Sequence, residues 1–199
     1  MPRILFPDGR TQNFNKDTNG FIIAESISKN LLKKAVAIFV NGEQKDLSDL
    51  ITEDAEIKII TKDSDEGLEI MRHTLTAQVL AKAIKTLYPK AKLAIGPTIE
   101  NGFYYDILFE KPISIDDFPA IEKEMKNIIK KGSKIEKLYK DKNQVKELFN
   151  SKKETYKVKI IDESKQENNF QIYKQKDSNF FDLCRGPHLP SLNLIGPFK

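Results

Sequence analysis

The sequence is poor in residues that cross-link chains or bind metals. Its 199 residues include one cysteine, Cys184, and two histidines. A single cysteine excludes an internal disulfide and favours a reducing compartment, and these three residues are too few for a structural zinc site with four protein ligands. No run approaches the roughly 20 apolar residues of a membrane span, and the start "MPRILFPDGR" lacks the apolar segment of a signal peptide. We therefore expect a soluble, cytoplasmic protein with no membrane partner.

Composition and charge are those of a folded chain. Hydrophobic residues make up 39% and charged residues 31%, with only nine glycines and nine prolines, which excludes collagen, low-complexity tracts and wholesale disorder. Residues 1–62 carry nine basic and nine acidic residues, so the whole excess of +4 lies in residues 63–199. A mildly basic segment suits a polyanion such as RNA, although lysine-rich surfaces also arise from AT-biased coding.

The first 62 residues predict a small β-β-α-β-β unit. A hairpin is expected at Asp8-Gly9, because this pair tolerates the positive φ angles of a tight turn. Apolar residues at helical spacing predict one helix over 21–35, and strand-like runs follow within 36–51 and at 56–60. This order is typical of a β-grasp fold. The charged run after it favours a boundary, giving domains 1–62 and 63–199.

The larger domain is expected to be α+β, with a long helix against an antiparallel sheet. Apolar residues spaced by three and four predict a helix over 68–88, which Pro89 ends. A second helix is expected over 115–132 and a short one around 143–150. The predicted strands are two within 92–109 and one in each of 134–139, 156–161, 170–175 and 178–184.

Candidate reactive groups gather near the end of the chain, in "FFDLCRGPHLP". Alternation along a strand puts Asp182 and Cys184 on one side of the pleat, and a Gly-Pro bend would return His188 towards them. This arrangement builds a small polar pocket, while the alternative is a turn with a buried cysteine and an exposed histidine. His73 lies beside the apolar stripe of the long helix, where a lone histidine is more often structural. Tyr104 either stacks on a base or belongs to the core.

Several motifs resemble a known family. "PDGR", "NGEQKDLS" and "EIKIIT" resemble the TGS domain, the ubiquitin-like β-grasp module at the start of threonyl-tRNA synthetases. "LEIMRH", "IGPTIENGFYYD" and "DLCRGPH" resemble the editing domain that follows it, and the motifs occur in the same order. Related editing domains occur in alanyl-tRNA synthetases, but the leading TGS module favours the threonyl enzyme.

The resemblance implies hydrolysis of serine wrongly esterified to tRNA(Thr), with the tRNA 3′ end and acceptor arm as partners. Such editing is needed because one missing methyl group is worth only about 1–3 kcal/mol to a threonine pocket. The family continues beyond the final "LIGPFK", so we expect an N-terminal fragment of a threonine–tRNA ligase. No cofactor is then expected here, because ATP, zinc and the homodimer contacts belong to a catalytic core that the fragment lacks.

The resemblance also assigns roles. His73 and Lys157 would orient water and polarise the ester, and Asp182 would hold the substrate amino group. Cys184 and His188 would shape the pocket, with His188 contacting the terminal ribose. We expect attack by water rather than by the thiol, since a cysteine nucleophile needs a low pKa and an aligned base. Three further residues are expected to bind substrate: Gln78, Tyr104 and Tyr173.

One departure from the family pattern weakens the expected chemistry. The family's helix carries His-x-x-x-His, whereas Ala77 is fourth after His73 and Gln78, fifth, aligns with the second histidine through a one-residue insertion. A fifth-place side chain lies about 140° from the first on an α-helix, against about 40° for the fourth. A π-bulge or a shifted helix start would accommodate the insertion, and both stay open.

Without the second histidine of the family pattern, we expect weak zinc binding and slow or absent hydrolysis of seryl-tRNA(Thr). At most His73, Cys184 and His188 remain as ligands. The alternatives to an editing hydrolase are therefore a degenerate module that only binds the tRNA acceptor arm, or a free-standing trans-editing protein.

Overall fold

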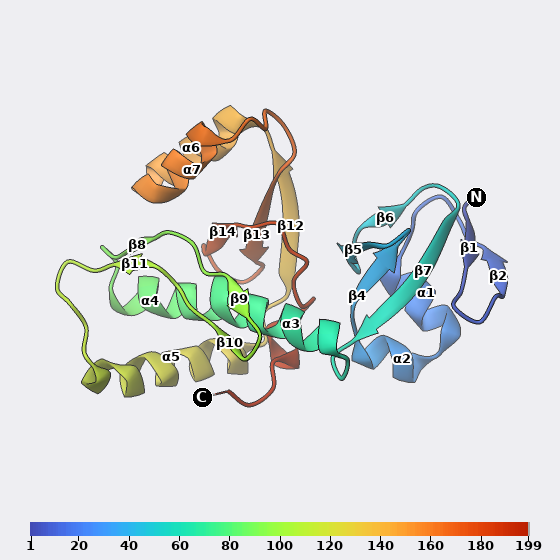
Figure 1. Cartoon of the computed structure of the whole chain (residues 1–199), viewed down its shortest axis with the longest axis horizontal. Coiled ribbons are helices and arrows are strands. Elements are labelled where there is room, and N and C mark those ends of the chain that lie inside the picture. Colours follow the sequence, from blue (N-terminus) through green and yellow to red (C-terminus); the bar gives the residue numbers. More distant parts are fainter. Residues whose placement is uncertain (199) are drawn as a thin grey trace. The chain divides into compact units, whose positions relative to one another are not determined.

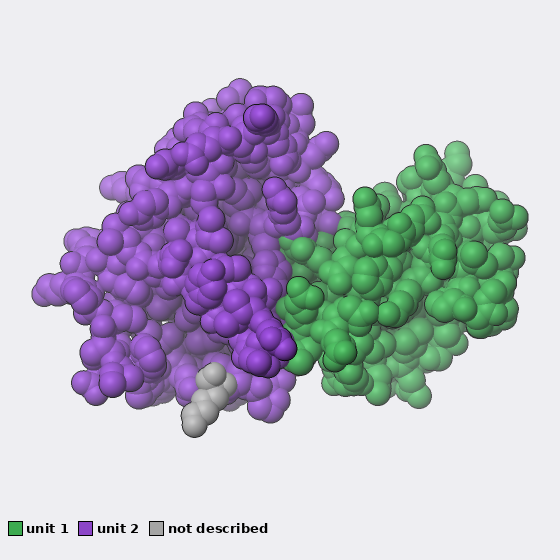
Figure 2. All heavy atoms as spheres, in the orientation of Figure 1, with its two compact units in different colours: residues 1–71, 186–190 green, residues 72–185, 191–199 purple. Residues whose placement is uncertain are grey.

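The computed structural model describes residues 1–198, which divide into two compact units. Unit 1 comprises Met1–Met71 with Gly186–Pro190, and unit 2 comprises Arg72–Arg185 with the described residues from Ser191 on (Figure 2). Along the chain, the division between Met71 and Arg72 falls within a helix that begins at Asp65. The two units are delimited by the contacts among their residues, and such units do not test a domain boundary. The boundary expected between residues 62 and 63 therefore stays a prediction.

Unit 1 is the expected β-grasp. Its five-stranded sheet has the order β2-β1-β7-β4-β5, in which β1 is parallel to β7 and the other neighbours are antiparallel (Figure 1). The expected Asp8-Gly9 hairpin is present, and Gly9 has φ +82°. The strands of the unit are β1 Arg3–Leu5, β2 Thr11–Asn13, β3 Thr18–Asn19, β4 Ala35–Val40, β5 Glu43–Asp46, β6 Leu50–Ile51 and β7 Ala55–Thr61.

The single helix expected over 21–35 is wrong, because the chain breaks it at Ser28. The residue is extended (φ −168°, ψ 151°), and its N–H donates to Ala24 O and closes α1, Gly20–Ile27. Its hydroxyl accepts from Leu31 N–H at 3.0 Å and starts α2, Lys29–Lys34. Serine side chains compete with the helical backbone in this way, and apolar periodicity does not register it. Ile23 and Ala24 of α1 are fully buried in the core beside the sheet.

Unit 2 is organised around the long helix, which runs from Asp65 to Leu87 as three segments. These are α3 Asp65–Thr74, a π-helical segment Leu75–Leu80, and α4 Ala81–Leu87. The second expected helix is α5, Phe118–Lys131, which packs beside α4 and ends at Gly132 (φ +64°) (Figure 1). The short 3-10 turns Ile115–Asp117 and Leu192–Leu194 complete the helical content of this layer.

A three-stranded antiparallel sheet forms the other half of unit 2, in the order β12-β13-β14. Its strands are β12 Ile135–Lys140, β13 Phe170–Gln175 and β14 Phe181–Leu183. Helices α6, Lys142–Ser151, and α7, Thr155–Glu163, share a core with β13. The strand expected at 156–161 is therefore wrong: Lys157 and Ile161, one helical turn apart, are both buried, and Ile161 packs in that core.

Between the long helix and α5, the chain forms a nested hairpin instead of the two continuous strands expected. Four two-residue strands pair as β8 with β11 and β9 with β10. They are β8 Lys92–Leu93, β9 Thr98–Ile99, β10 Gly102–Phe103 and β11 Ile107–Leu108. Among the described residues, no helix has the length and apolar character required to span a membrane.

Candidate functional site

Unit 2 contains a cavity of about 490 Å³ between its long helix, its sheet and α7. Five separate parts of the chain supply the walls, so the cavity exists only in the folded unit. Its lining consists of His73, Ala77, Ala94, Ile95, Gly96, Tyr105, Lys157, Ile160, Ser164, Gln166, Asn169, Phe170, Gln171, Asp182, Leu183, Cys184 and Arg185. Four of the five residues expected to be catalytic are among them.

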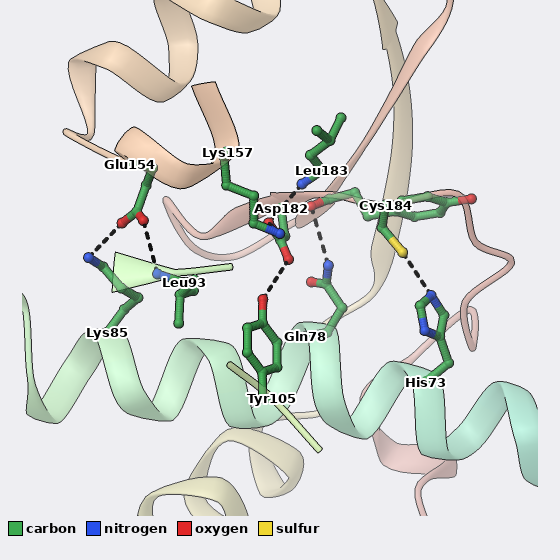
Figure 3. A network of polar contacts seen from close by, with 11 residues as sticks. His73, Gln78, Lys85, Leu93, Tyr105, Glu154, Lys157, Asp182, Leu183 and Cys184 are labelled. Carbon is green, nitrogen blue, oxygen red and sulfur yellow. Dashed lines mark hydrogen bonds and ion pairs between the residues drawn. The ribbon is translucent and has the colours of Figure 1, made fainter. Parts of the chain in front are cut away.

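One polar pair in the wall joins His73, in the last turn of α3, to Cys184, which directly follows β14. His73 Nε2 lies 2.7 Å from Cys184 Sγ, and both residues are partly exposed (Figure 3). The residues are 111 positions apart in sequence, and the packing of the helix against the sheet brings them together. An imidazole in a cavity wall can accept a proton from water at the nitrogen that does not contact the sulfur, so His73 has the chemistry of a general base.

The second pair is a buried ion pair between α7 and β14. Lys157 Nζ lies 2.9 Å from Asp182 Oδ1, with both side chains less than a tenth exposed. The same carboxylate accepts from Leu183 N–H at 2.8 Å and from the Tyr105 hydroxyl at 3.4 Å (Figure 3). These contacts fix the position of the Lys157 ammonium, a buried cation in the wall of the cavity.

Burial changes the titration of both acids in this cluster. Desolvation raises the pKa of Asp182, and the Lys157 ammonium acts in the opposite direction. Burial, followed by the nearby Asp182 charge, raises the pKa of Tyr105 far above its ordinary value, so its hydroxyl stays protonated and donates to the carboxylate. The Tyr105 hydroxyl is therefore a hydrogen-bond donor throughout the neutral range.

A further ion pair, which no sequence pattern predicted, anchors the start of α7. Lys85 Nζ in α4 lies 2.6 Å from Glu154 Oε1, and the other carboxylate oxygen accepts from Leu93 N–H at 3.4 Å (Figure 3). Glu154 immediately precedes α7. By tying α7 to α4 and β8, this contact holds Lys157 against the cavity.

The insertion in the long helix is accommodated by a π-bulge rather than by a shifted start. The N–H of Ala81 donates to Thr76 O, five residues earlier, as a π-helix requires. Ala77 lines the cavity beside His73, whereas Gln78 is not among the described lining residues. The Gln78 side chain is fully buried, and its Nε2 donates to Tyr173 O at 3.4 Å (Figure 3).

The other expected residues fall outside this cavity lining. Tyr173 is buried in β13, and Tyr104 is 54% exposed, whereas its neighbour Tyr105 forms part of the wall. His188 belongs to unit 1, where its buried backbone N–H donates to Asp46 Oδ1 at 3.0 Å. Its convergence with His73 and Cys184 stays a prediction, as do the roles expected for the tyrosines.

Gly96 is required by the close approach of the cavity wall to the helix. A Cβ at this position would overlap the Tyr105 ring and lie 2.8 Å from Thr76 Cγ2. We expect Gly96→Ala to lower the free energy of unfolding by about 1–3 kcal/mol, the usual cost of overpacking. Gly102→Ala is the matched control in the same hairpin, since a Cβ there meets nothing within 4 Å. Chemical denaturation of the two variants checks this, and equal stabilities would contradict it.

The fold and the site define a class of protein before a particular family. A β-grasp module precedes an α+β unit whose cavity holds a histidine, a cysteine and a buried lysine–aspartate pair. Residues 2–61 match the TGS domain, and residues 171–199 match the domain described as the threonyl and alanyl tRNA synthetase second additional domain. The chain thus carries additional domains of an aminoacyl-tRNA synthetase.

Comparison of nearly the whole chain with known proteins identifies more specific relatives. The threonine–tRNA ligase of Sinorhizobium fredii is 45% identical over 193 residues, and that of Bartonella bacilliformis is 42% identical over the same length. Each alignment covers 97% of this chain but 29% of the relative, so the chain spans under a third of these relatives. Nearly the whole chain is therefore similar to part of these threonine–tRNA ligases.

Proposed function

We propose that unit 2 is an editing module that hydrolyses the ester bond of seryl-tRNA(Thr), within an enzyme that joins threonine to tRNA(Thr) with ATP. The observation that carries the proposal is one cavity bounded by the His73–Cys184 and Lys157–Asp182 pairs. Its volume of about 490 Å³ lies in the range of small-molecule sites and suits an aminoacylated terminal nucleoside.

The chemistry assigns a separate task to each pair. The His73 imidazole accepts a proton from water at the ring nitrogen other than Nε2, which stays in contact with Cys184 Sγ, as the water attacks the ester carbonyl carbon. Negative charge then develops on the carbonyl oxygen, and the Lys157 ammonium, which the Asp182 contact holds in place, stabilises it. The carbon–oxygen bond to the ribose breaks, the ribose oxygen takes up a proton, and serine leaves.

Asp182 and Cys184 support these steps without forming a covalent intermediate. The second oxygen of Asp182, which accepts from the Tyr105 hydroxyl at 3.4 Å, also accepts from the substrate ammonium, while the first stays with Lys157. The Cys184 sulfur orients the imidazole across the 2.7 Å contact. We assign the attack to water rather than to the thiol, as the family resemblance implies, so that hydrolysis proceeds without a thioester.

A second candidate function has one observation in its favour. Ala77 occupies the cavity wall next to His73, and its methyl group supplies neither a base nor a metal ligand. His73 and Cys184 are the two potential zinc ligands that unit 2 brings together, and a structural zinc site takes four. The rival is therefore a module that binds the tRNA acceptor arm without catalysis, and weak zinc binding stays a prediction.

A deacylation assay separates these functions. The purified chain is incubated with seryl-tRNA(Thr) and, as the matched substrate, threonyl-tRNA(Thr). We expect the protein to accelerate release of serine at least 10-fold over the same mixture without protein. Release of threonine is expected to be unchanged, because the site would have to accommodate the additional methyl group of threonine. Tight tRNA binding without faster serine release would establish the binding module instead.

The remaining assignments follow from the family and are part of the same proposal. The partner is the 3′ end and acceptor arm of tRNA(Thr), and the compartment is the cytoplasm. Homodimer contacts and the ATP and zinc sites of the parent enzyme would lie in regions that this chain does not include. Analytical ultracentrifugation of this chain, with a monomer expected, tests the dimer assignment.

A further inference from the structure

The π-helical segment of the long helix is the local feature that sets the direction of His73. An α-helix that gains one residue turns everything before the insertion by about 100° relative to everything after it. Here α4 is fixed by its buried residues Ala83 and Ile84 and by packing against α5. Only the wide turn at Leu75–Leu80 absorbs the insertion and leaves His73 facing Cys184.

A π-turn is less stable than an α-turn and needs support from outside the helix. The support here comes from Gln175, the last residue of β13, which is fully buried. Its Nε2 donates to the backbone carbonyl of Gln78, inside the π-turn, at 2.6 Å. Its Oε1 accepts from Lys82 Nζ, in the first turn of α4, at 2.7 Å.

One side-chain amide therefore bridges the wide turn and the α-helix that follows it. The bridge is rigid, because the Gln175 backbone is itself held in the β13–β14 turn: its N–H donates to Phe180 O, and its carbonyl accepts from Ser178 N–H. Only an amide has both a donor and an acceptor at this distance from the strand, so the side chain matches the two groups that it meets.

We propose that Gln175 is a positioning residue: by holding the π-turn open it keeps the His73 imidazole against Cys184 in the cavity wall. It contacts neither the cavity nor the reacting atoms, and acts on the site only through the shape of the helix. Its effect on deacylation rests on the function proposed above, but its effect on the position of His73 does not.

The test uses the Gln175→Glu substitution, which keeps the side chain's size and an acceptor for Lys82 but removes the donor to Gln78 O. Lys82→Met is the matched control, since it removes the other half of the bridge and leaves the π-turn carbonyl bonded. The readout is the nuclear Overhauser effect between the His73 ring protons and the Cys184 β-protons, in a chain with two histidines and one cysteine.

We expect this effect in the wild type and in Lys82→Met, and at least a 10-fold loss of its intensity in Gln175→Glu. Destabilisation alone would lower the melting temperature but leave the signal of the folded molecules unchanged. Wild-type intensity in Gln175→Glu, or absence of the effect from the wild type, overturns the proposal.

A shortened helix provides an independent check. Deleting Ala77 removes the insertion, so the helix has no need of a wide turn. In that background, the Gln175→Glu change is expected to leave the signal unaltered, and a further loss there contradicts the proposal.

In the deacylation assay, Gln175→Glu in the full chain is expected to lower kcat about 100-fold with KM unchanged, since a displaced base costs about this much. If kcat falls while the nuclear Overhauser effect between His73 and Cys184 is unchanged, Gln175 does not act by positioning His73.

Discussion

The Lys157→Met variant is expected to lose about 3–5 kcal/mol of unfolding free energy near neutral pH, which is the usual cost of removing one partner of a buried ion pair. Asp182 would remain as a buried carboxylate with its nearest cation gone. Urea denaturation followed by circular dichroism measures the change. The charge, not the loss of packing, causes most of this effect, because methionine preserves the aliphatic part of the lysine side chain.

Two controls identify the cause. Lys159→Met lies on the same helix, where its ion pair with Glu163 is exposed (side chains 73% and 67%), and is expected to change stability by less than about 0.5 kcal/mol. The double variant Lys157→Met/Asp182→Asn removes both charges of this pair and should recover much of the loss. A double variant less stable than Lys157→Met would show that the charge of Asp182 does not cause the loss of unfolding free energy.

The loss in Lys157→Met should also depend on pH. Burial raises the pKa of Asp182, and without Lys157 nothing in the pair opposes that rise. A carboxyl whose pKa is higher in the folded state contributes stability below its unfolded pKa of about 3.9, and loses that contribution as pH rises through the folded pKa. The deficit relative to the wild type is therefore expected to be smaller at pH 4 than at pH 8, and a deficit that grows on acidification would contradict the assignment.

The His73→Ala variant is expected to release serine from seryl-tRNA(Thr) about 100-fold or more slowly than the wild type. The reason is that this imidazole is the proton acceptor in the proposed step, and general base catalysis is worth about 10²–10⁴. Single-turnover deacylation measures the rate of the chemical step directly. Rapid release that survives this substitution would reject His73 as the base.

The Cys184→Ser substitution serves as the partner experiment at the other end of the 2.7 Å contact. A hydroxyl can replace the thiol as a hydrogen-bonding partner of the imidazole but is a far weaker nucleophile at neutral pH. We expect the rate to change less than about 10-fold. A loss as large as that of His73→Ala, together with a trapped serine thioester in the wild type, would favour covalent catalysis.

Much of unit 1 could be predicted because local signals and the fold agree there. The Asp8-Gly9 hairpin has a positive φ angle at Gly9, which glycine tolerates, and the strands follow the expected order. The prediction failed at Ser28, where a side-chain hydroxyl divides the helix while the apolar spacing continues through the break. In unit 2, the alternation in 156–161 was mistaken for a strand, because packing against α6 rather than local pattern decides that segment.

The sequence by itself determined the family, the order of the two domains and four of the residues that line the cavity, because short motifs such as "DLCRGPH" carry this information locally. Only the tertiary structure decided that the inserted residue makes a π-turn, that Ala77 rather than Gln78 faces the cavity, and that Gln175 holds the turn. The reason is physical. The choice between a bulged helix and a shifted one depends on contacts nearly 100 residues away along the chain, and no local pattern contains them.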